Sequence, residues 1–206
     1  PFHSIKVLET LARLVLELRE HIPHYDTVLS DDASGRLVAL LLRKIINNKR
    51  SERGEKLKHT YFIAGGRIDQ ANIDLHSTKL NEFISQKKDS LGKTLLVVEY
   101  IQSGKGMETI LQTLENNGVD FDIATVSICH HPDSYDLNLL KHLYYGQRGN
   151  VGMRSFYNKF IHSGVIKDPH KVTAHPKKSA RANPRKMKEA RKDISLLAAE
   201  LSPLVD

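Results

Sequence analysis

The sequence of 206 residues contains one cysteine, Cys129, no tryptophan, and few aromatic residues of any kind. A single cysteine excludes an internal disulfide framework and fits a reducing compartment. No apolar run approaches the roughly 20 residues that a membrane-spanning helix needs. These absences exclude a disulfide-rich secreted domain, and we expect a cytoplasmic protein that has no membrane partner.

Basic residues are in excess, and the excess is concentrated near the C-terminal end. The formal net charge is +7, and residues 165–193 hold ten of the 31 Lys and Arg residues but three of the 24 Asp and Glu residues. Such a strip could bind nucleic acid or another polyanion, although a solvated helix face explains it equally well. We expect an α/β domain over residues 1–164 and a basic segment with a final helix over residues 165–206.

Apolar residues follow helical spacing in some segments and form short continuous runs in others. Helices are predicted over residues 4–22, 36–47, 107–117 and 185–201, and strands over residues 25–30, 59–64, 94–98 and 121–128. Residues 67–90 are expected to be helix and loop outside the sheet, and residues 47–58 and 144–152 to be loops. The alternation predicts an α/β fold with a mostly parallel sheet flanked by helices, in which ligands bind beyond the carboxyl ends of the strands.

A buried strand runs into a glycine-containing turn, which reads Gln102, Ser103, Gly104, Lys105, Gly106. The glycines allow backbone N–H groups to converge at the start of the next helix, where the helix dipole favours an anion. Tyr100 stands where a Walker A loop needs glycine, so the turn is not of that kind. An ordinary tight turn is the alternative, and we favour a phosphate-binding turn.

A second polar turn follows the first predicted strand and reads Asp31, Asp32, Ala33, Ser34, Gly35, Arg36. Ser34 can cap the next helix, and Arg36 can place its guanidinium on two phosphate oxygens. The alternative is an ordinary capped helix start in which the acids complement the helix dipole. This turn taken alone favours the capped helix start, whereas the order of the two turns in the family that they resemble favours a ligand-binding role.

Together the two turns resemble those of the type I phosphoribosyltransferase family, over roughly residues 3–130. The family signature is an apolar strand, two acidic residues, two apolar residues, a small or acidic residue, Thr, Gly, any residue and Thr. Glu99 falls on the second acid, while Val98 replaces the first. The turn that follows matches at Ser103, Gly104 and Lys105, but has Gln102 where many members carry a catalytic Asp and Gly106 where they carry Thr.

This resemblance implies a site for phosphoribosyl pyrophosphate (PRPP) or a related phosphoribosyl ligand. It implies a 5-phosphate at residues 102–106, ribose at Glu99 and pyrophosphate at residues 33–36. Family members transfer phosphoribose to a nitrogen nucleophile and release pyrophosphate, with Mg²⁺ held chiefly by the substrate. Asp31 and Asp32 would be outer metal ligands, Arg36 would stabilise the leaving group, and the three acids are the candidate bases.

The departures from the signature leave two activities open. One is an active phosphoribosyltransferase, and the other is a non-catalytic relative that uses residues 165–193 to bind nucleic acid or a partner. The oligomeric state is also open, with a homodimer as one candidate. A metal cluster at Cys129, His130, His131 and Asp133 is disfavoured, because adjacent ligands point in different directions. Packing is favoured over base stacking for Tyr144, Tyr145 and Tyr157.

Overall fold

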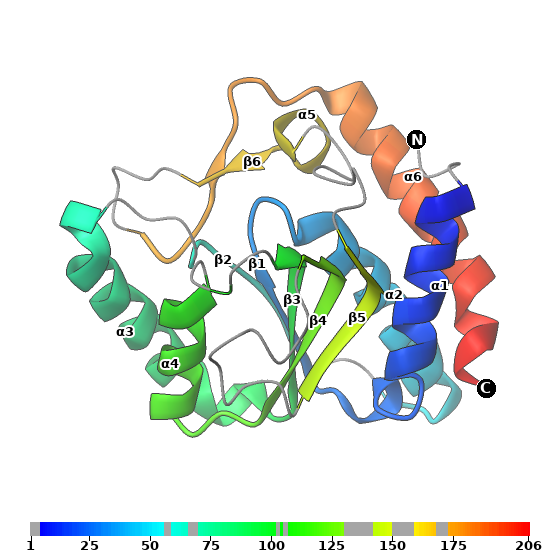
Figure 1. Ribbon diagram of the computed structural model, residues 1–206, viewed down its shortest axis with the longest axis horizontal. Helices are drawn as coiled ribbons and strands as arrows, with labels where there is room; N and C mark the ends of the chain where they lie inside the picture. Colours follow the sequence, from blue (N-terminus) through cyan, green and yellow to red (C-terminus); the bar gives the residue numbers. More distant parts are fainter. Residues whose placement is uncertain are drawn as a thin grey trace.

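The computed structural model describes residues 5–55, 59–65, 70–101, 104, 107–129, 142–149, 159–167 and 173–206. These residues form a five-stranded parallel sheet in the order β2-β1-β3-β4-β5, with helices on both faces (Figure 1). The strands are β1 (Thr27–Asp31), β2 (His59–Ile63), β3 (Thr94–Ile101), β4 (Phe121–Ile128) and β5 (Leu143–Arg148). The predicted α/β fold with a parallel sheet flanked by helices is confirmed.

Two layers of helices cover the sheet. One face carries α1 (Ile5–Leu18), α2 (Arg36–Glu52) and α6 (Pro184–Leu201), and the other carries α3 (Ile73–Leu91) and α4 (Glu108–Asn116). Short 3-10 turns lie at η1 (Ile22–His24), η2 (Gln70–Asn72) and η6 (Ser202–Val205). No helix within the described part of the chain is both long enough and apolar enough to cross a membrane.

The central strand β3 shows how the sequence produces this layered arrangement. Leu95 and Val97 belong to the core beneath α1, α2 and α6, whereas Leu96 and Val98 belong to the core beneath α3 and α4. Successive side chains of a strand point to opposite faces, so a strand that is covered on both sides must be apolar throughout. This requirement explains the continuous apolar run that identified β3 in the sequence.

The structure corrects two predicted segments. Residues 144–148, expected to be a loop, form most of the edge strand β5. The helix expected to end at Asn47 continues to Glu52, where a loop had been predicted. Residues 73–91 form the continuous helix α3, which lies outside the sheet in the region where helix and loop were expected. The final helix predicted over residues 185–201 is α6, whose apolar residues join the core of α1 and α2.

A small cap lies above the carboxyl ends of the strands (Figure 1). We use "cap" for residues 159–167 and 173–183, which include α5 (Lys159–Ser163), β6 (Val165–Ile166) and β7 (Lys177–Lys178). The strands β6 and β7 pair in antiparallel fashion. The backbone N–H of Ala64, just after β2, donates to the carbonyl of Ala174 at 3.0 Å and joins the cap to the sheet.

Candidate functional site at the carboxyl edge of the sheet

The strand order places the predicted ligand-binding turns at neighbouring strands. β1 and β3 are adjacent, but the chain leaves β1 through α2 and leaves β3 through α4. These two helices cover opposite faces of the sheet, so the two connections diverge at the carboxyl ends of β1 and β3. Ligands of open parallel sheets bind where connections diverge in this way. The candidate site therefore lies at this edge, beneath the cap.

Arg36, the first residue of α2, is held by two neighbours. Its Nε donates to Asp32 Oδ2 at 2.9 Å, and its Nη2 donates to the same oxygen. The guanidinium carbon also lies 3.8 Å from the centre of the Phe62 ring, which stacks against it. The side of the guanidinium formed by Nε and Nη2, which we expected Arg36 to offer to a phosphate, is thus directed to Asp32. Three of its five N–H donors, two on Nη1 and one on Nη2, remain for a ligand.

Asp32 is a completely buried carboxylate. Its exposed fraction is 0%, and its Oδ1 atom has no hydrogen-bond partner among the described residues. Burial raises the pKa of Asp32 from 3.8 to about 6, although the charge of Arg36 acts in the opposite direction. A buried, unpaired carboxylate oxygen is costly, and groups of this kind cluster at functional sites.

The neighbouring carboxylate, Asp31, connects three segments of the chain. Its Oδ1 accepts a hydrogen bond from the backbone N–H of Gly65, after β2, at 3.1 Å. The same oxygen accepts from Lys167 Nζ, in the cap, at 2.5 Å. The cap therefore contributes a cation directly at the turn that follows β1. Sequence reasoning missed Lys167, which lies 136 residues from Asp31 and has no local signal beyond being the first cation of residues 165–193.

The start of α2 differs from the prediction. The N-cap residue is Gly35 rather than Ser34, and no side-chain hydrogen bond caps the described helix, so the suggested Ser34 cap is wrong. The first N–H groups of α2 therefore have no side-chain acceptor. A Cβ at position 35 would lie 2.7 Å from the carbonyl oxygen of Val97 and 2.9 Å from that of Asp31. Glycine is required here because α2 begins directly against β3.

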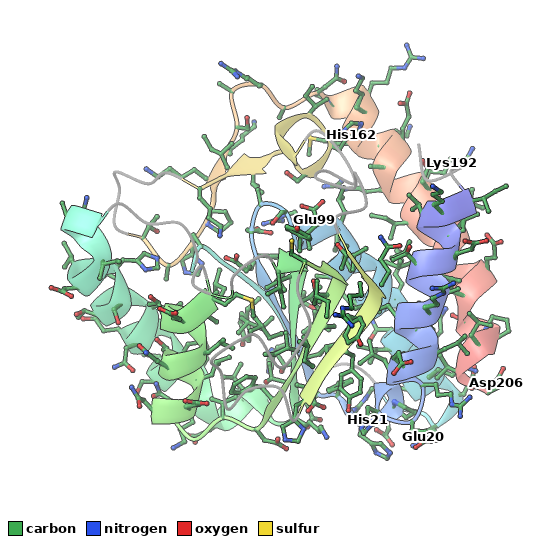
Figure 2. The ribbon with its side chains drawn as sticks, viewed as in Figure 1. Glu20, His21, Glu99, His162, Lys192 and Asp206 are labelled. Carbon is green, nitrogen blue, oxygen red and sulfur yellow. The ribbon has the colours of Figure 1, made fainter. Side chains whose placement is uncertain are left out.

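The end of β3 contributes a buried acid and a glycine turn. Glu99 lies near the carboxyl end of β3 (Figure 2), is 4% exposed, and shares the strand face of Leu95 and Val97 that α2 covers. Gly104 is buried, and its φ of 78° is a left-handed conformation that favours glycine. The other predicted residues of this turn lie outside the described residues: Gln102, Ser103, Lys105 and Gly106.

His76, on α3, lies beside the site and was not predicted from the sequence. The residue is 1% exposed, and its Nε2 is hydrogen-bonded to the carbonyl oxygen of Ala64. Burial lowers the pKa of His76, so its imidazole is neutral at pH 7. Because Nε2 then carries the proton, Nδ1 is an acceptor, and it has no partner among the described residues. His76 lies in a stretch of polar, mixed composition, and sequence reasoning therefore did not identify it as a site residue.

The described residues contain no group of three or more His, Cys, Asp or Glu side chains that could hold a metal ion. An Mg²⁺ at this edge would therefore need ligand oxygens in addition to Asp31, Asp32 or Glu99. The unpaired, buried Oδ1 of Asp32 fits a cation of this kind. His130, His131, Asp133 and Tyr157 lie outside the described residues.

The tyrosines of β5 serve packing. Tyr144 packs against the core of α1 and α2, and its ring centre lies 5.1 Å from that of His21. Tyr145 packs against the core on the opposite face of the sheet. Both side chains are partly buried, each between a core and the surface. These positions agree with packing, the role that the sequence favoured over base stacking.

A scan of the chain against protein-family models found no match, and a search of curated proteins found none either. The assignment of a function therefore depends on the geometry of the site and on the residues that form it.

Proposed function

We propose that the protein binds PRPP or a related phosphoribosyl ligand at the carboxyl ends of β1 and β3. The observation that carries this proposal is the divergence of the connections after these two strands, since both turns nominated from the sequence follow them. A glycine turn ends one strand and an uncapped helix start follows the other. An uncapped helix start and a glycine-containing turn would both offer backbone N–H groups to phosphate oxygens.

The side chains near these turns suit a ligand with two anionic ends and a hydroxylated middle. The turn at residues 102–106 would hold the 5-phosphate, and Glu99 would accept hydrogen bonds from ribose hydroxyls. The turn at residues 33–36 would hold the pyrophosphate, with Arg36 Nη1 and Lys167 Nζ as its cationic donors. Asp32 would position Arg36 and need not touch the ligand.

Three acids in one site would repel a pyrophosphate unless cations balance them. Arg36 and Lys167 balance two, because each is paired with one carboxylate of the turn after β1. Mg²⁺ that arrives with the ligand would add positive charge beside the pyrophosphate and stabilise the charge on it as it leaves. Lys167 would then exchange its contact with Asp31 for a ligand oxygen, so that the cap contributes a cation to the bound ligand.

Transfer of phosphoribose to a nitrogen nucleophile is the enzymatic form of this proposal. The nucleophile would form a bond to C1 of the ribose as the bond from C1 to the pyrophosphate oxygen breaks. A carboxylate with a pKa near neutrality suits acceptance of the proton that the nucleophile loses. Asp32 has that pKa, about 6, but its burial favours the positioning role.

Calorimetric titration with PRPP, ribose 5-phosphate and pyrophosphate, each with and without Mg²⁺, tests the proposal. We expect PRPP with Mg²⁺ to bind most tightly, and a Lys167→Gln variant to bind it at least tenfold more weakly, because a hydrogen bond between two charged groups contributes about 1.5–3 kcal/mol. Lys79→Gln, at an exposed position on α3, is the matched control and should bind normally.

Two outcomes would refute the proposal. One is a folded protein that binds none of the three ligands. The other is PRPP binding that survives both Lys167→Gln and Gly104→Val, since valine cannot easily adopt the left-handed backbone conformation of position 104. If PRPP binds, a screen of nucleobases for pyrophosphate release distinguishes the enzyme from a non-catalytic binding protein.

A further inference from the structure

The last long helix, α6, has two chemically different sides. Its apolar side joins the core with α1 and α2 through Ala190, Ile194, Leu197, Ala198 and Leu201. The opposite side of its first half is exposed and carries Arg185, Lys188 and Lys192, three and four residues apart. A helix anchored in this way presents its cations on a rigid support, and the basic residues therefore do not belong to a free tail.

The basic side continues into the cap and is not neutralised. Six exposed basic residues of β7, α6 and the segment between them have no ion-pair partner among the described residues: Lys178, Arg181, Lys186, Lys188, Arg191 and Lys192. Arg185 is paired, with its Nε 3.0 Å from Glu189 Oε1. We call these seven residues the basic surface. Unpaired charges gathered on one element repel each other, and an anionic partner would relieve that repulsion.

The position of these charges along α6 also favours an anionic partner. Arg185 and Lys186 lie in the first turn, which contains no acidic residue. The first turn is the positive end of the helix dipole, where cations are unfavourable and anions are stabilised. Asn183 caps the helix by accepting a hydrogen bond from the backbone N–H of Lys186 at 3.1 Å. The helix start is therefore complete without its cations, which add only positive charge.

The surroundings of the basic surface favour one class of polyanion. An amphipathic helix that binds a membrane must bury its apolar side in the lipid, but the apolar side of α6 is already buried in the core. Proteins that bind single strands stack bases on aromatic side chains, and residues 173–206 contain no Phe, Tyr or Trp. A regular array of phosphates, such as the backbone of a duplex, needs neither feature.

We infer that the basic surface binds the phosphate backbone of a double-stranded nucleic acid, without reading its sequence. From Arg185 to Lys192 the helix rises about 10 Å, at about 1.5 Å per residue. A duplex presents a negative charge about every 1.7 Å of its axis, so several phosphates lie within reach of α6. This function does not depend on the phosphoribosyl site, because no residue of the basic surface takes part in that site.

Fluorescence anisotropy with a DNA duplex of about 20 base pairs, measured over a range of salt concentrations, tests the inference. If all six unpaired cations contact phosphates, the slope of log K against log salt is about −5, and affinity falls roughly a thousandfold between about 50 and about 200 mM salt. The triple variant Lys188→Gln/Arg191→Gln/Lys192→Gln removes three contacts. Its slope should be about −3, and its loss over the same range roughly fortyfold.

The matched control is the triple variant Lys79→Gln/Lys87→Gln/Lys88→Gln on α3, which covers the other face of the sheet. It removes the same charge and should bind like the unchanged protein. Equal weakening by both triple variants would reduce the effect to net charge and overturn the inference. So would the absence of duplex binding at about 50 mM salt, tighter binding to the single strand, or binding only to vesicles rich in phosphatidylserine.

Discussion

Replacing the buried carboxylate Asp32 with asparagine should stabilise the fold at neutral pH. In the native protein Asp32 holds its proton up to about pH 6, whereas the pKa of the exposed group is 3.8. The native state therefore binds more protons between these values, and the free energy of unfolding falls as the pH rises through this window. The difference between the two pKa values corresponds to about 3 kcal/mol.

Asp32→Asn removes this loss, because the amide stays neutral at every pH and can still accept a hydrogen bond from Arg36. We expect urea denaturation at pH 7–8 to show a gain of about 1–3 kcal/mol over the unchanged protein. The gain should shrink toward zero as the pH approaches 4, where the native carboxyl is already protonated. Asp89→Asn, at an exposed position on α3, is the control and should show no gain that depends on pH.

A variant that is less stable by a constant amount from pH 4 to pH 8 would refute this reasoning. That result would mean that the contact between Asp32 and Arg36 stabilises the fold by more than the burial of the carboxylate costs. The expected result has a functional consequence as well. A residue whose charge destabilises the native state is typical of a binding or catalytic site, so the more stable variant should bind PRPP more weakly.

Two further substitutions test the packing on which the site depends. Gly35→Ala places a methyl group 2.7 Å from the carbonyl oxygen of Val97. We expect the free energy of unfolding, measured by urea denaturation, to fall by about 1–3 kcal/mol, and PRPP binding to weaken. An unchanged denaturation midpoint would contradict the close approach of α2 to β3. Tyr25→Phe removes the hydroxyl that donates to buried Asp122 at 2.7 Å. The free energy of unfolding at pH 7 should fall by about 1–3 kcal/mol, and unchanged stability would contradict this expectation.

The parts of the fold that could be predicted are those whose sequence pattern matches their burial. β3 was recognisable because a strand covered on both faces must be apolar. The edge strand β5 was not recognisable, because it contains a glycine, Gly146, and a second glycine, Gly149, follows directly after it. Gly146 is required by a contact with a distant part of the chain. A Cβ there would lie 2.2 Å from the carbonyl oxygen of Thr10, on α1. The residues next to Gly146 in the sequence do not indicate this close contact with α1.

The extension of α2 beyond Asn47 has a similar explanation. Lys49 and Arg50 look like loop residues, but both are buried against partners far along the chain. Lys49 is paired with Asp206, and Arg50 donates to the carbonyl oxygen of Tyr25 at 2.8 Å. Polar residues of this kind extend a helix only when the tertiary structure supplies their partners. Periodicity within one segment cannot reveal those distant partners.

The residues of the candidate site fall into the same two groups, those predictable from local sequence and those that depend on distant contacts. The turn after β1 was predictable because glycine, serine and acidic residues at the end of an apolar strand have local consequences. Most of the turn predicted after β3 lies outside the described residues. Lys167 and His76 were not predictable, because each reaches the site from an element that sequence reasoning had set apart. Long-range partners of this kind decide which side chains surround the candidate site, whereas local motifs indicate which turns could hold a phosphate.

The two proposals assign separable roles to the cap and to α6. Lys167 contacts Asp31 at the candidate site, while the basic surface extends from β7 along α6. Substitutions that are distant and share no partner have nearly additive effects. Lys167→Gln should therefore weaken PRPP binding and leave the salt slope of duplex binding unchanged, and the triple variant on α6 should do the reverse. Each proposal can fail without the other.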